Sequence, residues 1–127
     1  MIKDKELDIL IGELETAASM PIADFEGVLN ALRFVLPGKV PEDIGPDRIA
    51  TTDGALLVAD DAFPNWAVRV HGRANDKDGH WHCTLRRDDT RDNDAAIGSG
   101  RSPVLAQAIL AAVLRLAMIT DGRPGRA

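Results

Sequence analysis

The first third of the chain has apolar residues at the spacing of an α-helix. In residues 3–18 they recur every three or four positions between acidic residues, which predicts an amphipathic helix. A second series with the same period starts near Ile22 and ends where Pro37 and Gly38 stop it. Gly27 lies inside this second helix, either because a neighbour packs closely there or because the helix is simply weaker.

The middle of the chain changes to the two-residue period of β-strands. The segments 49–52 and 55–59 flank Asp53-Gly54, a favoured hairpin turn, so the sequence predicts a strand on each side of it. The segments 66–73 and 80–86 alternate more clearly between apolar and polar residues. Their predicted inward residues are Trp66, Val68, Val70, Trp81, Cys83 and Leu85.

The alternation also restricts how these two strands pair. A slip of one residue would mix the apolar and polar faces, so Val70 is expected opposite Cys83 or Leu85. One such register places His71 opposite His82. Ala95–Ile97 is predicted as a further short edge strand.

The last apolar segment predicts a long helix. Ser102 is expected to cap it, with a proline at the first helical position and a flexible lead-in at residues 98–100. Over residues 104–119 only Gln107 and Arg115 are polar. This segment is too short and too polar to span a bilayer, so it is expected to be buried. Either it also meets a second copy of the chain in a homodimer, or the first two helices cover its remaining surface.

These elements define an α+β fold. It has two N-terminal helices, a three- to four-stranded antiparallel β-meander, and a long apolar C-terminal helix packed on the sheet. We expect an amphipathic helix within residues 1–21, an α-β-β-β-α core over residues 22–120 and a flexible tail at residues 121–127, in one domain.

Composition and charge narrow the class of protein. With 127 residues, 45% of them hydrophobic, the chain can bury a core without cross-links. The single cysteine, Cys83, forbids an internal disulfide, and no signal-peptide pattern opens the chain, so a cytoplasmic location is expected. The net charge of −5 disfavours broad binding to nucleic acid or to anionic membranes.

Three short motifs resemble a known family. Leu36-Pro37-Gly38 ends the second helix, tryptophans stand at Trp66 and Trp81, and Ser102-Pro103 opens the apolar helix. Together they resemble the small phage proteins of the ABA-sandwich domain family, over roughly residues 22–119. The resemblance implies a phage or prophage accessory protein without an established activity, and it supplies no catalytic residue. One departure is that a sheet covered on both sides should be apolar on both faces, whereas these strands alternate.

A second resemblance concerns the end of the chain. Gly98-Ser-Gly-Arg-Ser102 followed by an alanine-rich helix is similar to the end of a double-stranded-RNA-binding domain. That family implies two helices on one face of a three-stranded sheet. It also has lysines at the start of this helix, where Pro103 and Val104 stand here, so the electrostatic basis of RNA binding is missing.

The polar faces of the two clear strands hold the strongest candidate site. Its residues are Arg69, His71, Arg73, His80, His82 and Arg86. They form either an ordinary solvated face or a docking surface for an acidic protein, which would strengthen as histidines protonate below about pH 6.5. The three histidines alone could form a zinc site, but the arginines repel a cation and no carboxylate is placed to orient the rings, so no metal is predicted.

A weaker candidate is an anion site at the start of the last helix, from Gly98, Gly100, Arg101 and Ser102. A flexible lead-in with a helix cap explains the same residues. The aspartates of residues 88–94 lack the glycine and glutamate of a calcium loop, and no serine lies in a nucleophile elbow.

The sequence therefore predicts no catalytic set and no cofactor. The leading hypothesis is a phage-derived, non-catalytic module that binds another protein. The alternatives are a metal-assisted hydrolase using His71, His80 and His82, and a degenerate double-stranded-RNA-binding module.

Overall fold

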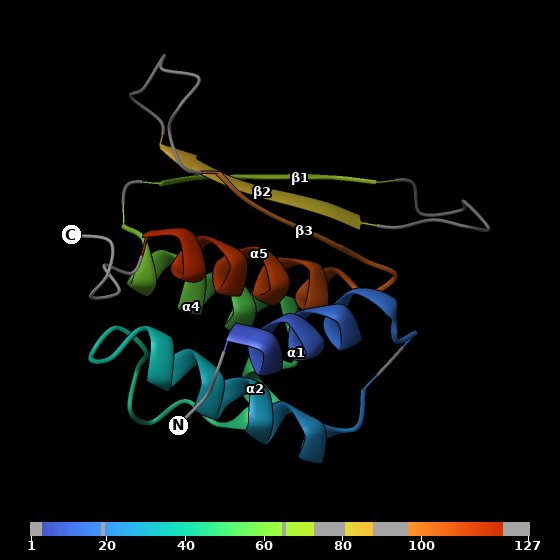
Figure 1. Ribbon diagram of the computed structural model, residues 1–127, viewed down its shortest axis with the longest axis vertical. Helices are drawn as coiled ribbons and strands as arrows, with labels where there is room; N and C mark the ends of the chain where they lie inside the picture. The colour runs from blue at the N-terminus through green and yellow to red at the C-terminus, as the bar shows by residue number, and fades with distance from the viewer. Residues whose placement is uncertain (1–3, 19, 65, 73–80, 88–96, 121–127) are drawn as a thin grey trace.

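The computed structural model describes residues 4–18, 20–64, 66–72, 81–87 and 97–120. The elements are α1 (Asp4–Thr16), α2 (Ile22–Val35), α3 (Pro46–Ile49), α4 (Thr52–Ala62), β1 (Trp66–His71), β2 (Trp81–Arg87), β3 (Gly98–Ser102) and α5 (Leu105–Thr120). The strands form one layer, and all of these helices lie on the same side of it (Figure 1). The fold is α+β, with the C-terminal helix packed on an antiparallel sheet.

The sheet has the strand order β1-β2-β3, and both pairs are antiparallel. Val70 lies opposite Cys83 and His71 opposite His82, which is one of the two registers that the alternation left open. Cys83 and Leu85 on the central strand are fully buried against the helices. The polar residues of the same strands therefore point away from the helical layer.

The predicted strands around Asp53-Gly54 are wrong, because this part of the chain is helical. Thr51 caps α4 by accepting a hydrogen bond from the backbone N–H of Gly54 at 3.0 Å. Gly54 is needed for close packing and not for a hairpin turn, since a Cβ there would lie 1.9 Å from the carbonyl oxygen of Arg48. The buried residues of α4 follow a helical period; they are Gly54, Ala55, Val58, Ala59 and Ala62.

Helix α5 is the centre of the core. Residues 106–114 are all buried, because the sheet covers one side of the helix and α1 and α4 pack against its other sides. The burial of residues 106–114 agrees with the alternative in which other helices of the same chain cover this helix, and the homodimer through it stays a prediction. Among the described residues, no helix combines the length and hydrophobicity needed to cross a bilayer.

Strand β3 occupies the place where a flexible lead-in was predicted. Its two glycines let the strand lie directly on α5: a Cβ on Gly98 would come 2.6 Å from the carbonyl oxygen of Ala112, and one on Gly100 would come 2.4 Å from that of Ala108. The helix begins at Leu105, two residues later than predicted. Ile97 precedes the strand, and the rest of the predicted edge strand 95–97 lies outside the described residues.

Strand β1 lies at the edge of the sheet that α5 does not cover. Val68 and Val70 are on the helix-facing side, as predicted, yet they remain 37% and 38% exposed. Trp66 and Trp81 are half-buried and pack against the core, and Trp66 also contacts Phe63 with ring centroids 5.5 Å apart. The alternation thus predicted which way the side chains point, but not how far the helical layer extends.

Candidate functional site

The sheet surface turned away from the helices, called the open face here, is cationic. By the strand register it presents Arg69, His71, His82, Thr84, Arg86, Ser99 and Arg101. The three strands contain no Asp or Glu, whereas α1 alone contains five acidic residues. A chain with a net charge of −5 therefore carries a surface of opposite sign on one side.

Two of the three predicted histidines meet on the open face. The rings of His71 and His82 stack with centroids 4.9 Å apart and planes 9° from parallel. A zinc ion lies about 2.0 Å from a ring nitrogen and near the plane of its ring, so two stacked parallel rings do not share one ion in this arrangement. Among the described residues, no group of three metal-ligating side chains is assembled. His80 and Arg73 lie outside the described residues.

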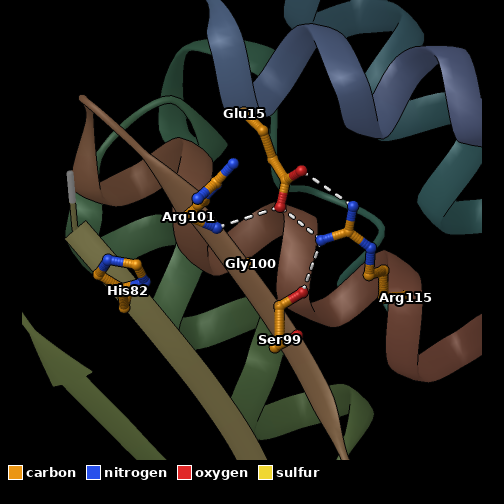
Figure 2. A pocket seen from close by; sticks show the side chains of 6 residues that line it. All are labelled: Glu15, His82, Ser99, Gly100, Arg101 and Arg115. Carbon is orange, nitrogen blue, oxygen red and sulfur yellow. Dashed lines mark hydrogen bonds and ion pairs between the residues drawn. The ribbon is translucent and has the colours of Figure 1, made fainter.

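A hollow of about 300 Å³ opens beside β3, where the open face meets the helical layer (Figure 2). It is lined by Glu15, His82, Ser99, Gly100, Arg101 and Arg115. The hollow exists because β3 consists of small residues apart from one arginine, so that its backbone is accessible between a histidine on β2 and charged side chains from α1 and α5.

Glu15 and Arg115 form a two-pronged ion pair in this hollow, called the edge clamp here. One guanidinium nitrogen of Arg115 bonds Glu15 Oε2, and Arg115 Nη2 donates to Oε1 at 2.9 Å. The same two side chains bind the free edge of β3. Arg115 Nη1 donates to the carbonyl oxygen of Ser99 at 3.0 Å, and the backbone N–H of Arg101 donates to Glu15 Oε2 at 3.2 Å (Figure 2).

The edge clamp takes the place that a neighbouring strand would occupy. A β-strand partner would offer one donor and one acceptor to the outward N–H and C=O groups of β3. Arg115 supplies the donor and Glu15 the acceptor. The clamp therefore closes this edge of the sheet to further strand pairing.

The charges of the clamp stabilise each other. Burial alone would raise the pKa of the Glu15 carboxyl, but hydrogen bonds from the Arg115 side chain and the Arg101 backbone outweigh burial and lower the pKa below its ordinary value of 4.5. The hydrogen bonds that Arg115 donates to the Glu15 carboxylate raise the pKa of the Arg115 guanidinium. The Arg115 side chain is 40% exposed, so solvent screens much of this attraction.

We expect Glu15→Gln to lower the free energy of unfolding by about 1 kcal/mol near neutral pH. Since the pKa of Glu15 is lower in the folded than in the unfolded chain, its stabilisation is complete above pH 4.5 and is lost as the pH falls through the folded value. The difference between wild type and variant should therefore shrink in acid. Urea unfolding over a pH series measures it, with Glu13→Gln, an exposed carboxyl on the same helix, as the control. A constant difference at all pH values would contradict the expectation.

The residues of the predicted anion site are used within the fold. Gly98 and Gly100 face α5, and Ser102 is buried, with its hydroxyl oxygen accepting hydrogen bonds from the Val104 backbone and from Gln107. The backbone N–H of Arg101 already holds the Glu15 carboxylate. The anion bound at the predicted site is thus the Glu15 carboxylate of the protein itself.

The hollow brings a hydroxyl, an imidazole and a carboxylate together without joining them. Among the described residues, no hydrogen bond connects His82 with Ser99 or with Glu15, and the carboxylate is engaged by Arg115. A nucleophile needs an adjacent base to be activated. Cys83 is not a substitute, because burial raises the pKa of its thiol to about 11.

The sequence did not single out Glu15, Ser99 or Arg115 as site residues. Glu15 and Arg115 are one hundred positions apart, so no local spacing joins them. The one available signal was that Arg115 is the single charged residue of the apolar helix α5. No family model matches the chain, and the comparisons with curated proteins and with solved structures found no match.

Proposed function

We propose that this protein is a non-catalytic interaction module that binds an acidic segment of a partner protein on the open face of its sheet. The observation that carries the proposal is the separation of charge. Arginines and histidines lie on the open face, and the strands contain no acidic residue. The described helices pack only on the other side of the sheet. Such a surface attracts acidic groups more than the net charge suggests.

The arrangement of the open face also favours a protein partner over the alternatives. The hydroxyl, imidazole and carboxylate in the hollow are not linked as an activated nucleophile requires, and the stacked imidazoles do not converge on one ion. The three arginines that the described strands place on the open face are few for a duplex RNA, whose binding depends on many phosphate contacts. The phage origin suggested by the family resemblance stays a prediction.

Charge reversal on the open face tests the proposal. The probe is a short, fluorescein-labelled peptide of Glu and Asp, measured by fluorescence anisotropy at about 50 mM salt, where exposed charges are screened less than at about 150 mM. We expect binding to the wild type and a loss of about tenfold or more in affinity for the double variant Arg69→Glu, Arg86→Glu. The matched control is Lys39→Glu, Arg48→Glu, because both residues are exposed on the helical side and the change in net charge is the same.

Three outcomes would overturn the proposal. The first is no binding of the acidic peptide by the wild type. The second is an equal loss in the control variant, which would indicate only a nonspecific effect of net charge. The third is preferential binding of a duplex RNA oligonucleotide, which would favour the RNA-binding alternative.

A further inference from the structure

The two edges of the sheet differ in whether side chains of the protein bind their outward backbone groups. The edge clamp of Glu15 and Arg115 occupies the outward C=O group of Ser99 and the outward N–H group of Arg101 on β3. No described side chain does the same for β1 at the other edge. Because an edge with unused N–H and C=O groups can pair with another strand, β1 is where the sheet can be extended.

The clamp also shows which residues of β1 direct their backbone outward. In antiparallel pairs the N–H and C=O of successive residues point to alternate sides of the strand. The backbone N–H and C=O groups of Ser99 and Arg101 are directed away from β2, so those of their neighbour Gly100 are directed toward Cys83 on β2. On β2, the backbone groups of His82 and Thr84 are then directed toward β1.

On β1, the partners of His82 and Thr84 are His71 and Arg69, so the backbone N–H and C=O groups of these two residues are directed toward β2. Those of Trp66, Val68 and Val70 are therefore directed outward, away from the sheet. One contact agrees with this assignment independently. The backbone N–H of Trp66 donates to the carbonyl oxygen of Phe63 at 3.2 Å, so it is turned away from β2. The outward groups of Val68 and Val70 have no such partner among the described residues.

The side chains at this edge define what an added strand should contain. On the helix-facing side, Val68 and Val70 are more than a third exposed and offer apolar contact. On the open face, Arg69 and His71 offer positive charge at the same edge. An added strand has a two-residue period, so it would place apolar residues beside the valines and acidic residues beside the cations.

We infer that β1 binds an extended segment of a partner protein in which acidic and β-branched apolar residues alternate, and that this segment becomes the fourth strand of the sheet. The inference rests on the proposed function and specifies its partner. A second copy of β1 fits less well, because it would bring Arg69 and His71 of both copies onto one face without any carboxylate between them.

The test uses peptides that differ in one property at a time. The probe is a labelled peptide with the core Glu-Val-Glu-Ile-Asp-Val between glycines. The first control has lysines in place of the acids, and the second has the same composition with the acids and the apolar residues in separate blocks. We expect the alternating acidic peptide to bind at least about tenfold more tightly than either control.

Methylation of the peptide backbone tests strand pairing without changing the protein. Blocking the N–H groups of one alternate set of residues should weaken binding about tenfold or more, and blocking the other set should change it little, because only one edge of the peptide faces β1. In the protein, Val68→Pro removes an outward N–H at an edge position and should weaken binding similarly. Its unfolding curve shows whether it remains folded, and the methylated peptides decide the matter if it does not.

The outcomes separate this inference from the proposed function. If Arg69→Glu, Arg86→Glu weakens binding but neither methylated set does, the open face binds acidic peptides and the added strand is wrong. If no acidic peptide binds at all, the proposed function fails as well. If wild-type protein forms dimers that Val68→Pro abolishes, the edge is used by a second copy and the inference is overturned.

Discussion

Replacing Gly100 by alanine should lower the free energy of unfolding by about 3 kcal/mol. The added Cβ would lie 2.4 Å from the carbonyl oxygen of Ala108 and 2.7 Å from the backbone nitrogen of Ala112. Both atoms belong to the backbone of α5, so no side-chain rotation can relieve the overlap. The strand and the helix would have to separate, which loosens the contact through which the sheet covers the core. Urea unfolding followed by circular dichroism measures the change.

The matched control for this prediction is Gly27→Ala. A Cβ at Gly27 would meet nothing within 4 Å, and the residue is exposed in the middle of α2. Alanine there should raise the free energy of unfolding by about 0.5–1 kcal/mol through helix propensity alone. Gly27 thus weakens its helix and does not allow a close contact, which decides between the two interpretations of the sequence. Equal effects at Gly27 and Gly100 would contradict the packing argument.

Replacing Gln107 by leucine should lower the free energy of unfolding by about 3 kcal/mol. Gln107 is 1% exposed, and its Nε2 donates to the carbonyl oxygens of Leu14 and Ala17, both at 3.0 Å, and to the hydroxyl of Ser102 at 3.2 Å. The two carbonyl groups lie at the C-terminal end of α1, where the helix itself provides no donor. Leucine has a similar size but leaves them without a partner beside the core.

Thermal and urea unfolding of Gln107→Leu and of Asn30→Ala provide the comparison. Asn30 is an exposed amide on α2, so its loss should change stability by less than about 0.5 kcal/mol. Ser102→Ala removes only one acceptor of the Gln107 amide and should have an intermediate effect. If Gln107→Leu were as stable as wild type, the amide would not be what fastens α1 to α5.

The parts of the fold that the sequence predicts well are those with a strong period. The alternation of β1 and β2 predicted which residues share a face and limited the register to two alternatives, because a slip of one residue would bury charged side chains; the structure has the register with Val70 opposite Cys83. The segment 49–62 was predicted as strands because Asp53-Gly54 is typical of a hairpin. Its helical capping by Thr51 and the contact of Gly54 with α3 depend on tertiary packing that the local pattern does not contain.

The sequence predicted the cations of the candidate site but not its edge clamp. The cations of the open face follow from strand parity, so Arg69, His71, His82 and Arg86 were identified from the sequence. The edge clamp was not, because Glu15 and Arg115 are joined only when α1 packs on α5. Gln107 and Arg115, the two polar residues of the apolar segment 104–119, are the residues of this segment whose side chains form hydrogen bonds with α1 and the residues just after it.

The reactivity of Cys83 reports when the sheet separates from the helices. It is the single cysteine of the chain, it is fully buried on the central strand, and it lies opposite Gly100. A thiol reagent can reach it only when the sheet lifts from the helices, and burial keeps the sulfur protonated while the protein is closed. The rate at which a thiol reagent labels the wild-type protein therefore measures how often the sheet separates from the helices, and no cysteine has to be introduced.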